Sequence, residues 1–187
     1  MIWPFKRKAT TETGARYYIR DAAVADAKAL VEFKHRVWRD MFGHLKDDTF
    51  FAQAEATTEN QVAFWQSQMK RGRKVWIAED LRDRLVGTIH VTAQHSEHTA
   101  AFVAAHTLGD VQEIRYFYLA DGVADSTLGQ ELIRVALGDQ PAITWLMGKA
   151  PLVEASLRQS GFEPLGEPVE PTEEPWHGVP RQAMVRK

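Results

Sequence analysis

The segment 112–132 constrains the fold more than any other part of the sequence, because it predicts a strand, a tight turn and a helix in direct succession. Dense β-branched and aromatic residues over 114–119 indicate the strand, and the polar stretch 121–126 indicates the turn. The helix is predicted by apolar residues that share one face at helical spacing: Leu128, Leu132, Val135 and Ala136. This succession is typical of an α/β domain.

The start of this predicted helix is suited to bind an anion. Asp125 or Ser126 would cap it and Gly138 would end it. The backbone amides of residues 127–130 would then lack partners inside the helix, and the helix dipole would favour a phosphate beside them. The signal is weak by itself, because most α/β proteins contain such a turn.

The remaining sequence predicts one domain without repeats. Strands are expected at 17–20, 75–79, 85–92, 143–147 and 183–186, and the hairpin turn lies at 81–84. A first helix ends near Gly43 and is indicated by one stripe: Ala27, Leu30, Val31, Lys34, Val37, Trp38 and Met41. Further helices are expected over 59–71 and from Pro151 to a stop at Gly161-Phe162. Residues 43–58 are expected to form a loop.

Composition narrows the classes of protein that remain. The chain has 187 residues, a formal net charge of −2 and no cysteine. This charge argues against general affinity for nucleic acid, and the missing thiols exclude disulfides and a cysteine nucleophile. No apolar run approaches a membrane span, so a soluble, cytoplasmic protein is expected. Residues 1–14 are expected to form a disordered leader and 15–187 the domain, since the polar run 6–14 cannot offset its ordering entropy.

From about Tyr17 to Arg186, the order and spacing of these elements resembles the GNAT family of acyl-CoA-dependent N-acyltransferases. The family's fourth strand carries Glu-Leu-x-x-Leu-Tyr-Val, matched here by Glu113, Ile114, Phe117, Tyr118 and Leu119. Its Gln/Arg-x-x-Gly-x-Gly/Ala loop would end at Gly129. The resemblance implies a single-domain α/β (α+β) fold with a mixed, mostly antiparallel sheet of about six or seven strands flanked by about four helices.

The resemblance also implies that acetyl-CoA is the cosubstrate and that an amine attacks its thioester directly in a ternary complex. Amides near Phe117 and Leu119 would stabilise the oxyanion, and the amides of 127–130 would hold the pyrophosphate. The implied cofactor-binding positions are Phe117, Tyr118, Leu119, Ala124, Asp125, Ser126, Thr127, Leu128, Gly129 and Gln130.

Two catalytic residues follow from the same resemblance. Glu113 stands where the family often keeps the base that accepts the amine proton, although it could instead pair with Arg115 and have no catalytic role. Leu157 stands where a Tyr usually protonates the leaving thiolate, so Tyr118, Tyr116 or water would do so here, or the thiolate would leave unprotonated.

The acceptor is expected to be a small-molecule or peptide amine, in contact with Phe42, Trp176 and His177. Carboxylates over 163–174 could attract a cationic amine or form a solvated connection. The histidines over 90–106 form no convincing metal motif, so no metal is expected; His90 or His106 could serve as acceptor-side bases. At least three of the tryptophans at 38, 65, 76 and 145 are expected in the core. The chain could be a monomer or a homodimer.

Four positions depart from the family pattern: Ala124, Thr127, Ala150 and Leu157. In addition, Asp125 places a negative charge beside the implied phosphate site. These departures leave a second hypothesis open, in which the chain is a catalytically silent acyltransferase-like module that binds a ligand or a protein partner.

Overall fold

A computed structural model describes residues 7–10, 14, 16–123, 125–172 and 174–187. Its elements in chain order are β1 (Arg7–Thr10), β2 (Arg16–Asp21), a 3-10 turn (Val24–Asp26), α1 (Ala27–Phe42), α2 (Asp48–Ala56), α3 (Thr58–Lys70), β3 (Trp76–Glu79), β4 (Leu85–Thr92), α4 (Glu97–Ala105), β5 (Gln112–Leu119), α5 (Thr127–Leu137), β6 (Ala142–Met147), α6 (Pro151–Gln159), β7 (Glu163–Pro164) and β8 (Arg181–Arg186).

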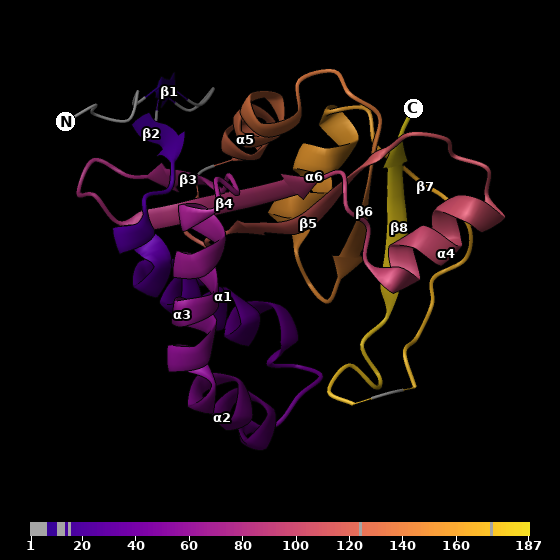
Figure 1. Cartoon of the computed structure of the whole chain (residues 1–187), viewed down its shortest axis with the longest axis horizontal. Coiled ribbons are helices and arrows are strands. Elements are labelled where there is room, and N and C mark those ends of the chain that lie inside the picture. Colours follow the sequence, from indigo (N-terminus) through magenta and orange to yellow (C-terminus); the bar gives the residue numbers. More distant parts are fainter. Residues whose placement is uncertain (1–6, 11–13, 15, 124, 173) are drawn as a thin grey trace.

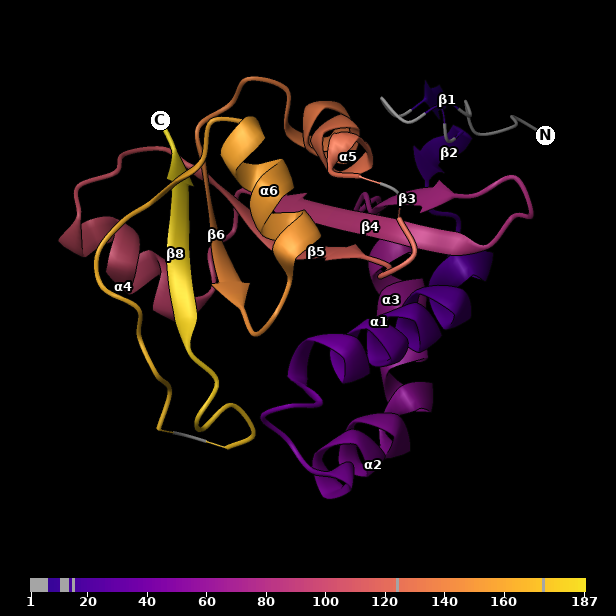
Figure 2. The same ribbon diagram turned by 180° about the vertical axis from the view of Figure 1, so that it is seen from behind.

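A mixed sheet forms the centre of the molecule, with strands in the order β1-β2-β3-β4-β5-β6-β8-β7. Every neighbouring pair is antiparallel except β5 and β6, which run parallel. Helices α5 and α6 lie on one side of the sheet and α1, α2 and α3 on the other (Figures 1 and 2). The expected α/β fold with a mostly antiparallel sheet is confirmed, with slightly more strands and helices than predicted.

Hydrophobic periodicity explains why this chain forms these layers. Leu128 and Leu132 of α5 are buried against the face of the sheet that α5 and α6 cover, in a cluster with Ile114, Phe117 and Leu119 of β5. The register of β5 against β4 skips Arg115, and beyond this bulge side chains alternate, so Tyr116 and Tyr118 point to the side opposite Phe117 and Leu119. There Tyr118 packs on the aromatic cluster of α1 and α2.

Residues 43–58 were expected to form a loop, and this was wrong for the part that is α2. The carboxylate of Asp47 accepts a hydrogen bond from the Phe50 amide (3.1 Å) and so caps the helix. Phe50 and Phe51 are buried and hold α2 against α1. The segment 97–105, where no helix was predicted, is the helix α4, capped by Ser96. Neither helix gathers its apolar residues on one clear stripe, and both were therefore missed.

At the N-terminus, four residues of the expected disordered leader form β1, which pairs with β2 from Arg7↔Ile19 to Thr10↔Arg16. The expectation is corrected for those four residues, because the open edge of β2 offers backbone partners that composition does not register. Residues 1–6 and 11–13 lie outside the described part. The tryptophans at 38, 65, 76 and 145 are only half-buried, each packed on the edge of an apolar cluster. A wide indole ring rarely becomes fully enclosed.

Within the described residues, no helix combines the length and the apolar content needed to cross a membrane.

Candidate functional site

Strands β5 and β6 separate part-way along their length and open the sheet. They pair only from Gln112↔Ala142 to Ile114↔Thr144, although β5 continues to Leu119 and β6 to Met147. The pairing of β5 with β4 skips Arg115, a bulge that bends β5 at the point where the strands part. Beyond Ile114, the side of β5 that faces β6 therefore has no paired strand and can direct backbone groups to a ligand.

A cleft of about 210 Å³ lies beside this opening. It is lined by Phe117 and Tyr118 near the end of β5, by the end of β6, and by aromatic side chains of α1 and of the loop before β8. Phe42 and Trp176, both expected at the acceptor, lie together in that group with ring centroids 5.5 Å apart. Leu157, fully buried, also lines the cleft. Position 157, where the resemblance implies a general acid, therefore lines the cleft, but its leucine side chain cannot donate a proton.

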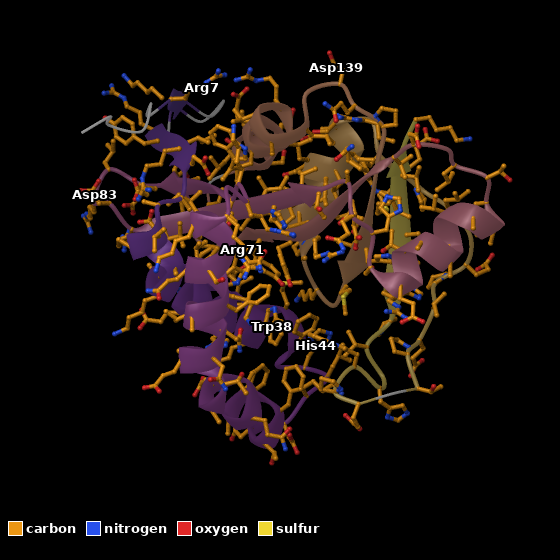
Figure 3. The ribbon with its side chains drawn as sticks, in the orientation of Figure 1. Arg7, Trp38, His44, Arg71, Asp83 and Asp139 are labelled. Atoms are coloured by element: carbon orange, nitrogen blue, oxygen red, sulfur yellow. The ribbon has the colours of Figure 1, made fainter. Side chains whose placement is uncertain are left out.

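Tyr118 lies in the wall of this cleft with its hydroxyl fixed. Its oxygen accepts a hydrogen bond from Trp38 Nε1 at 3.1 Å. An indole N–H can only donate, so the Tyr118 proton is left available for another acceptor. Burial raises the pKa of Tyr118 far above its usual value, so the hydroxyl stays protonated. Trp38 belongs to α1, on the side of the sheet that α1, α2 and α3 cover (Figure 3).

A second hollow of about 120 Å³ continues from the cleft toward the first turn of α6. The two share Met41, Ala150 and Val153 in their walls. Leu119 lines the second hollow. The charged side chains around it are two carboxylates and one ammonium: Asp40, Asp121 and Lys149. Burial, with the nearby charge of Asp121, raises the pKa of Asp40. Sequence reasoning missed Lys149, which has no distinguishing pattern.

The start of α5 has fewer unpaired amides than expected. Asp125 Oδ1 accepts a hydrogen bond from the Thr127 amide (2.9 Å), and the Gln130 amide donates to Ser126 O (3.1 Å). Among the described residues, the amides of Leu128 and Gly129 have no backbone acceptor, so these two could meet a ligand. A carboxylate of the chain itself therefore occupies part of the implied phosphate site.

Helix α6 closes over the same turn. Ser156 Oγ donates to Ser126 O at 3.0 Å, and Ser126 Oγ donates to Gln159. Gln130 Nε2 also donates to Gln159 Oε1, at 2.8 Å. A Cβ atom on Gly129 would come within 2.1 Å of Ser156 Oγ, so glycine is needed for this close approach. Ala124, the remaining predicted member of this loop, lies outside the described residues.

Glu113 lies at the other end of β5, buried to 4% exposure under α4. Its carboxylate accepts hydrogen bonds from the Ser96 amide (2.7 Å) and from the Ser96 and Thr99 hydroxyls (both 3.0 Å), and it pairs with Arg115 (3.2 Å). Although burial opposes ionisation, these partners lower the pKa of Glu113 overall. Neither cavity described above includes Glu113. The contacts favour the alternative in which it anchors a neighbouring element.

His90 of β4 is a candidate general base on the side of the sheet that α1 and α3 cover. It is 2% exposed, and β4–β5 register places it opposite Tyr116, on whose ring it stacks. Its Nδ1 is 2.9 Å from the carbonyl of Lys74. A carbonyl can only accept, so Nδ1 carries the proton and the lone pair is on Nε2. Burial lowers the pKa of His90 and keeps the imidazole neutral.

The other predicted residues are not drawn into the cleft. The side chain of His177 is exposed, and its carbonyl accepts a hydrogen bond from Lys46 (2.7 Å). His106 stacks on Phe102 in α4 at 4.0 Å between centroids. Among the described His, Asp and Glu side chains, no group of three or more could hold a metal ion.

Neither protein-family models nor curated protein sequences gave a match to this chain. Solved structures did. A PaiA N-acetyltransferase from Thermoplasma acidophilum, in complex with coenzyme A, has a TM-score of 0.62 at 11% identity and covers 91% of this chain and 98% of its own. A putative phosphinothricin N-acetyltransferase has a TM-score of 0.58 at 17% identity, and the match covers 91% of this chain and 98% of that protein. YncA, a putative acetyltransferase from Salmonella typhimurium with its cofactor acetyl-CoA, has a TM-score of 0.58 at 14% identity, and the match covers 91% of this chain and 93% of that protein. The chain therefore has the fold of the GNAT acetyltransferases, as the sequence resemblance predicted.

Proposed function

We propose that this protein is an N-acyltransferase that moves an acetyl or other small acyl group from acyl-CoA to an amine in a ternary complex. The observation that carries the proposal is the separation of β5 from β6 beside a cleft that adjoins a second hollow. A thioester arm could lie along this path, with its carbonyl near the unpaired side of β5 at 117–119. Acyl-CoA supplies the activated acyl group, and the amine displaces the thiolate.

Tyr118 is assigned as the proton donor to the departing thiolate. It faces the cleft, keeps its proton at neutral pH, and is oriented by Trp38. Replacing Tyr118 by Phe should lower kcat by about 10²-fold or more, since general-acid assistance is worth about 10²- to 10⁴-fold. Tyr116→Phe is the matched control on the same strand. A loss confined to Tyr116→Phe would transfer the role to that residue.

His90 replaces Glu113 as our candidate for the base. His90 lines a pocket that also includes Tyr116 and Tyr118, and its Nε2 has one long contact, 3.5 Å to the Arg73 guanidinium, whereas the Glu113 carboxylate is held by several hydrogen-bond donors. A neutral imidazole can accept the proton that the amine loses. His90→Gln should remove the acidic limb of the pH profile of kcat/KM, and an unchanged profile would exclude this role.

The first test is calorimetric titration of the protein with acetyl-CoA, followed by a screen of amines in which released CoA thiol is measured. Micromolar binding, about 8 kcal/mol, and amine-dependent thiol release would support the enzyme. Binding without release across the amine panel would leave the cofactor site supported and the transfer unsupported.

A second function is favoured by the start of α5. The Asp125 carboxylate holds the Thr127 amide, and Asp40 and Asp121 add negative charge along the path of the cofactor. These features suit a GNAT-like module that binds a different ligand or a protein and performs no transfer. Absence of binding at millimolar CoA would favour this second function.

A further inference from the structure

A separate pocket of about 260 Å³ lies on the side of the sheet that α1 and α3 cover. Its walls come from α1, α3, β4 and β5, and they are mostly aromatic and aliphatic: Leu30, Val31, Phe64, Trp65, Val75 and Tyr116. Phe64 of α3 is 52% exposed, so the pocket is open to solvent at this wall. An apolar cavity of about 150 Å³ can hold a benzene molecule, so this one has room for one aromatic ring with a short chain.

Lys34 is the one lysine, arginine or carboxylate among the residues that line this pocket. Its ammonium donates to the Gln61 side-chain oxygen and lies 4.5 Å from the centre of the Trp38 ring. Within the described part of the chain, no carboxylate forms an ion pair with it. Loss of solvation lowers the pKa of Lys34 to about 8, which still leaves most of it charged at pH 7.

The groups around Lys34 do not balance its charge. His90 of β4 and His35 of α1 are neutral, since burial lowers the pKa of both. Tyr116 and Tyr118 of β5 remain protonated because burial raises theirs. Arg73 adds a further cation 3.5 Å from His90 Nε2. A poorly solvated cation is costly unless a counter-ion is supplied, so the pocket is suited to a ligand that brings a negative charge.

We propose that this pocket binds an aromatic carboxylate, with its carboxylate on the Lys34 ammonium and its ring against Trp65 and Tyr116. Resting on the proposed function, the acceptor would then be an aromatic amine that also carries a carboxylate. Its amine would be directed to His90 and to the shared wall of Tyr116 and Tyr118, which lines both this pocket and the thioester cleft. A purely cationic amine would be repelled by Lys34.

The test uses two probes with the same ring and opposite charge, phenylacetate and phenethylamine, without CoA. Binding is followed by tryptophan fluorescence at pH 7, since Trp65 lines the pocket. We expect phenylacetate to bind at least tenfold more tightly than phenethylamine, and Lys34→Met to weaken phenylacetate at least tenfold. The matched control is Lys28→Met on the same helix, where the ammonium is 75% exposed and 3.8 Å from Glu32.

Equal affinity of the two probes, tighter binding of phenethylamine, or an equal loss in both lysine variants would overturn the proposal. If Lys34→Met does not fold, the comparison of the two probes on the wild-type protein decides. Because CoA is absent, failure of this assay leaves acetyl-CoA binding untouched, and the calorimetric titration with acetyl-CoA reports separately on the proposed transferase.

Discussion

Asp125 offers the sharpest perturbation of the cofactor site. Its carboxylate is 2.9 Å from the Thr127 amide, so a phosphate bound at the next two amides would lie about 5 Å from it. At an effective dielectric of 20, each phosphate charge would be repelled by about 3 kcal/mol, and screening at physiological salt reduces this to about half. Asp125→Asn keeps an oxygen that can accept from Thr127 and removes only the charge.

We therefore expect Asp125→Asn to bind CoA at least tenfold more tightly than the wild-type protein, with a larger gain at 50 mM than at 300 mM NaCl. Calorimetry of both proteins at the two salt concentrations measures this. The cost to helix stability should stay within about 1 kcal/mol, the usual value of a charge at a helix start.

Asp139→Asn is the matched control, because it changes net charge equally. Asp139 lies beyond the C-terminal end of α5, at the outer edge of the molecule (Figure 3), about 16 Å of helix away. An equal gain in both variants would show a general effect of net charge. No gain in Asp125→Asn would refute the assignment of the phosphate site to this turn.

Three further predictions test the packing of the site. Glu113→Gln should lower the free energy of unfolding by about 2 kcal/mol, because the side-chain amide would face hydrogen-bond donors that now meet a carboxylate. The same variant should preserve kcat per folded molecule. A lower kcat at unchanged stability would restore Glu113 as the base. Lys34 has a folded-state pKa of about 8 against 10.5 when unfolded, so folding releases its proton between these values. The stability of the wild type relative to Lys34→Met should thus rise by about 2 kcal/mol from pH 8 to 10.5, after discounting for partial exposure, and a flat difference in denaturant unfolding would contradict this. Gly129→Ala should cost about 1–3 kcal/mol through overpacking against Ser156, with partial rescue by Ser156→Gly; additive losses in the double variant would argue against that contact.

Strong periodicity made much of the fold predictable. The stripe of α1, the stop of α5 at Gly138 and the start of α6 at Pro151 were all read from local patterns, and each lies where expected. Helices α2 and α4 were missed because their apolar residues do not recur on one face, whereas α6, also nine residues long, was marked by Pro151 at its start and Gly161 after its end. Their caps, Asp47 and Ser96, were the local signals available.

The roles of the site residues were less predictable than their positions. The sequence located Phe117, Tyr118 and Trp176, and the structure brings them to one cleft. It did not reveal that Glu113 would be enclosed by donors from α4, since Ser96 and Thr99 are distant in sequence. Lys34 was assigned to the apolar stripe of the first helix, and this gave its position on the helix correctly. The stripe did not predict that its ammonium would lie in a pocket.

By itself, the sequence determined most of the strands and helices, though not β1, α2 or α4, and the resemblance to the GNAT fold, because periodicity and turn residues act over a few neighbouring positions. Tertiary structure alone decided the parting of β5 from β6, the closure of α6 over the start of α5, and the lack of a counter-ion for Lys34 among the described residues. Each depends on which distant side chains meet, and on how much water their packing removes, and these quantities exist only once the chain has folded.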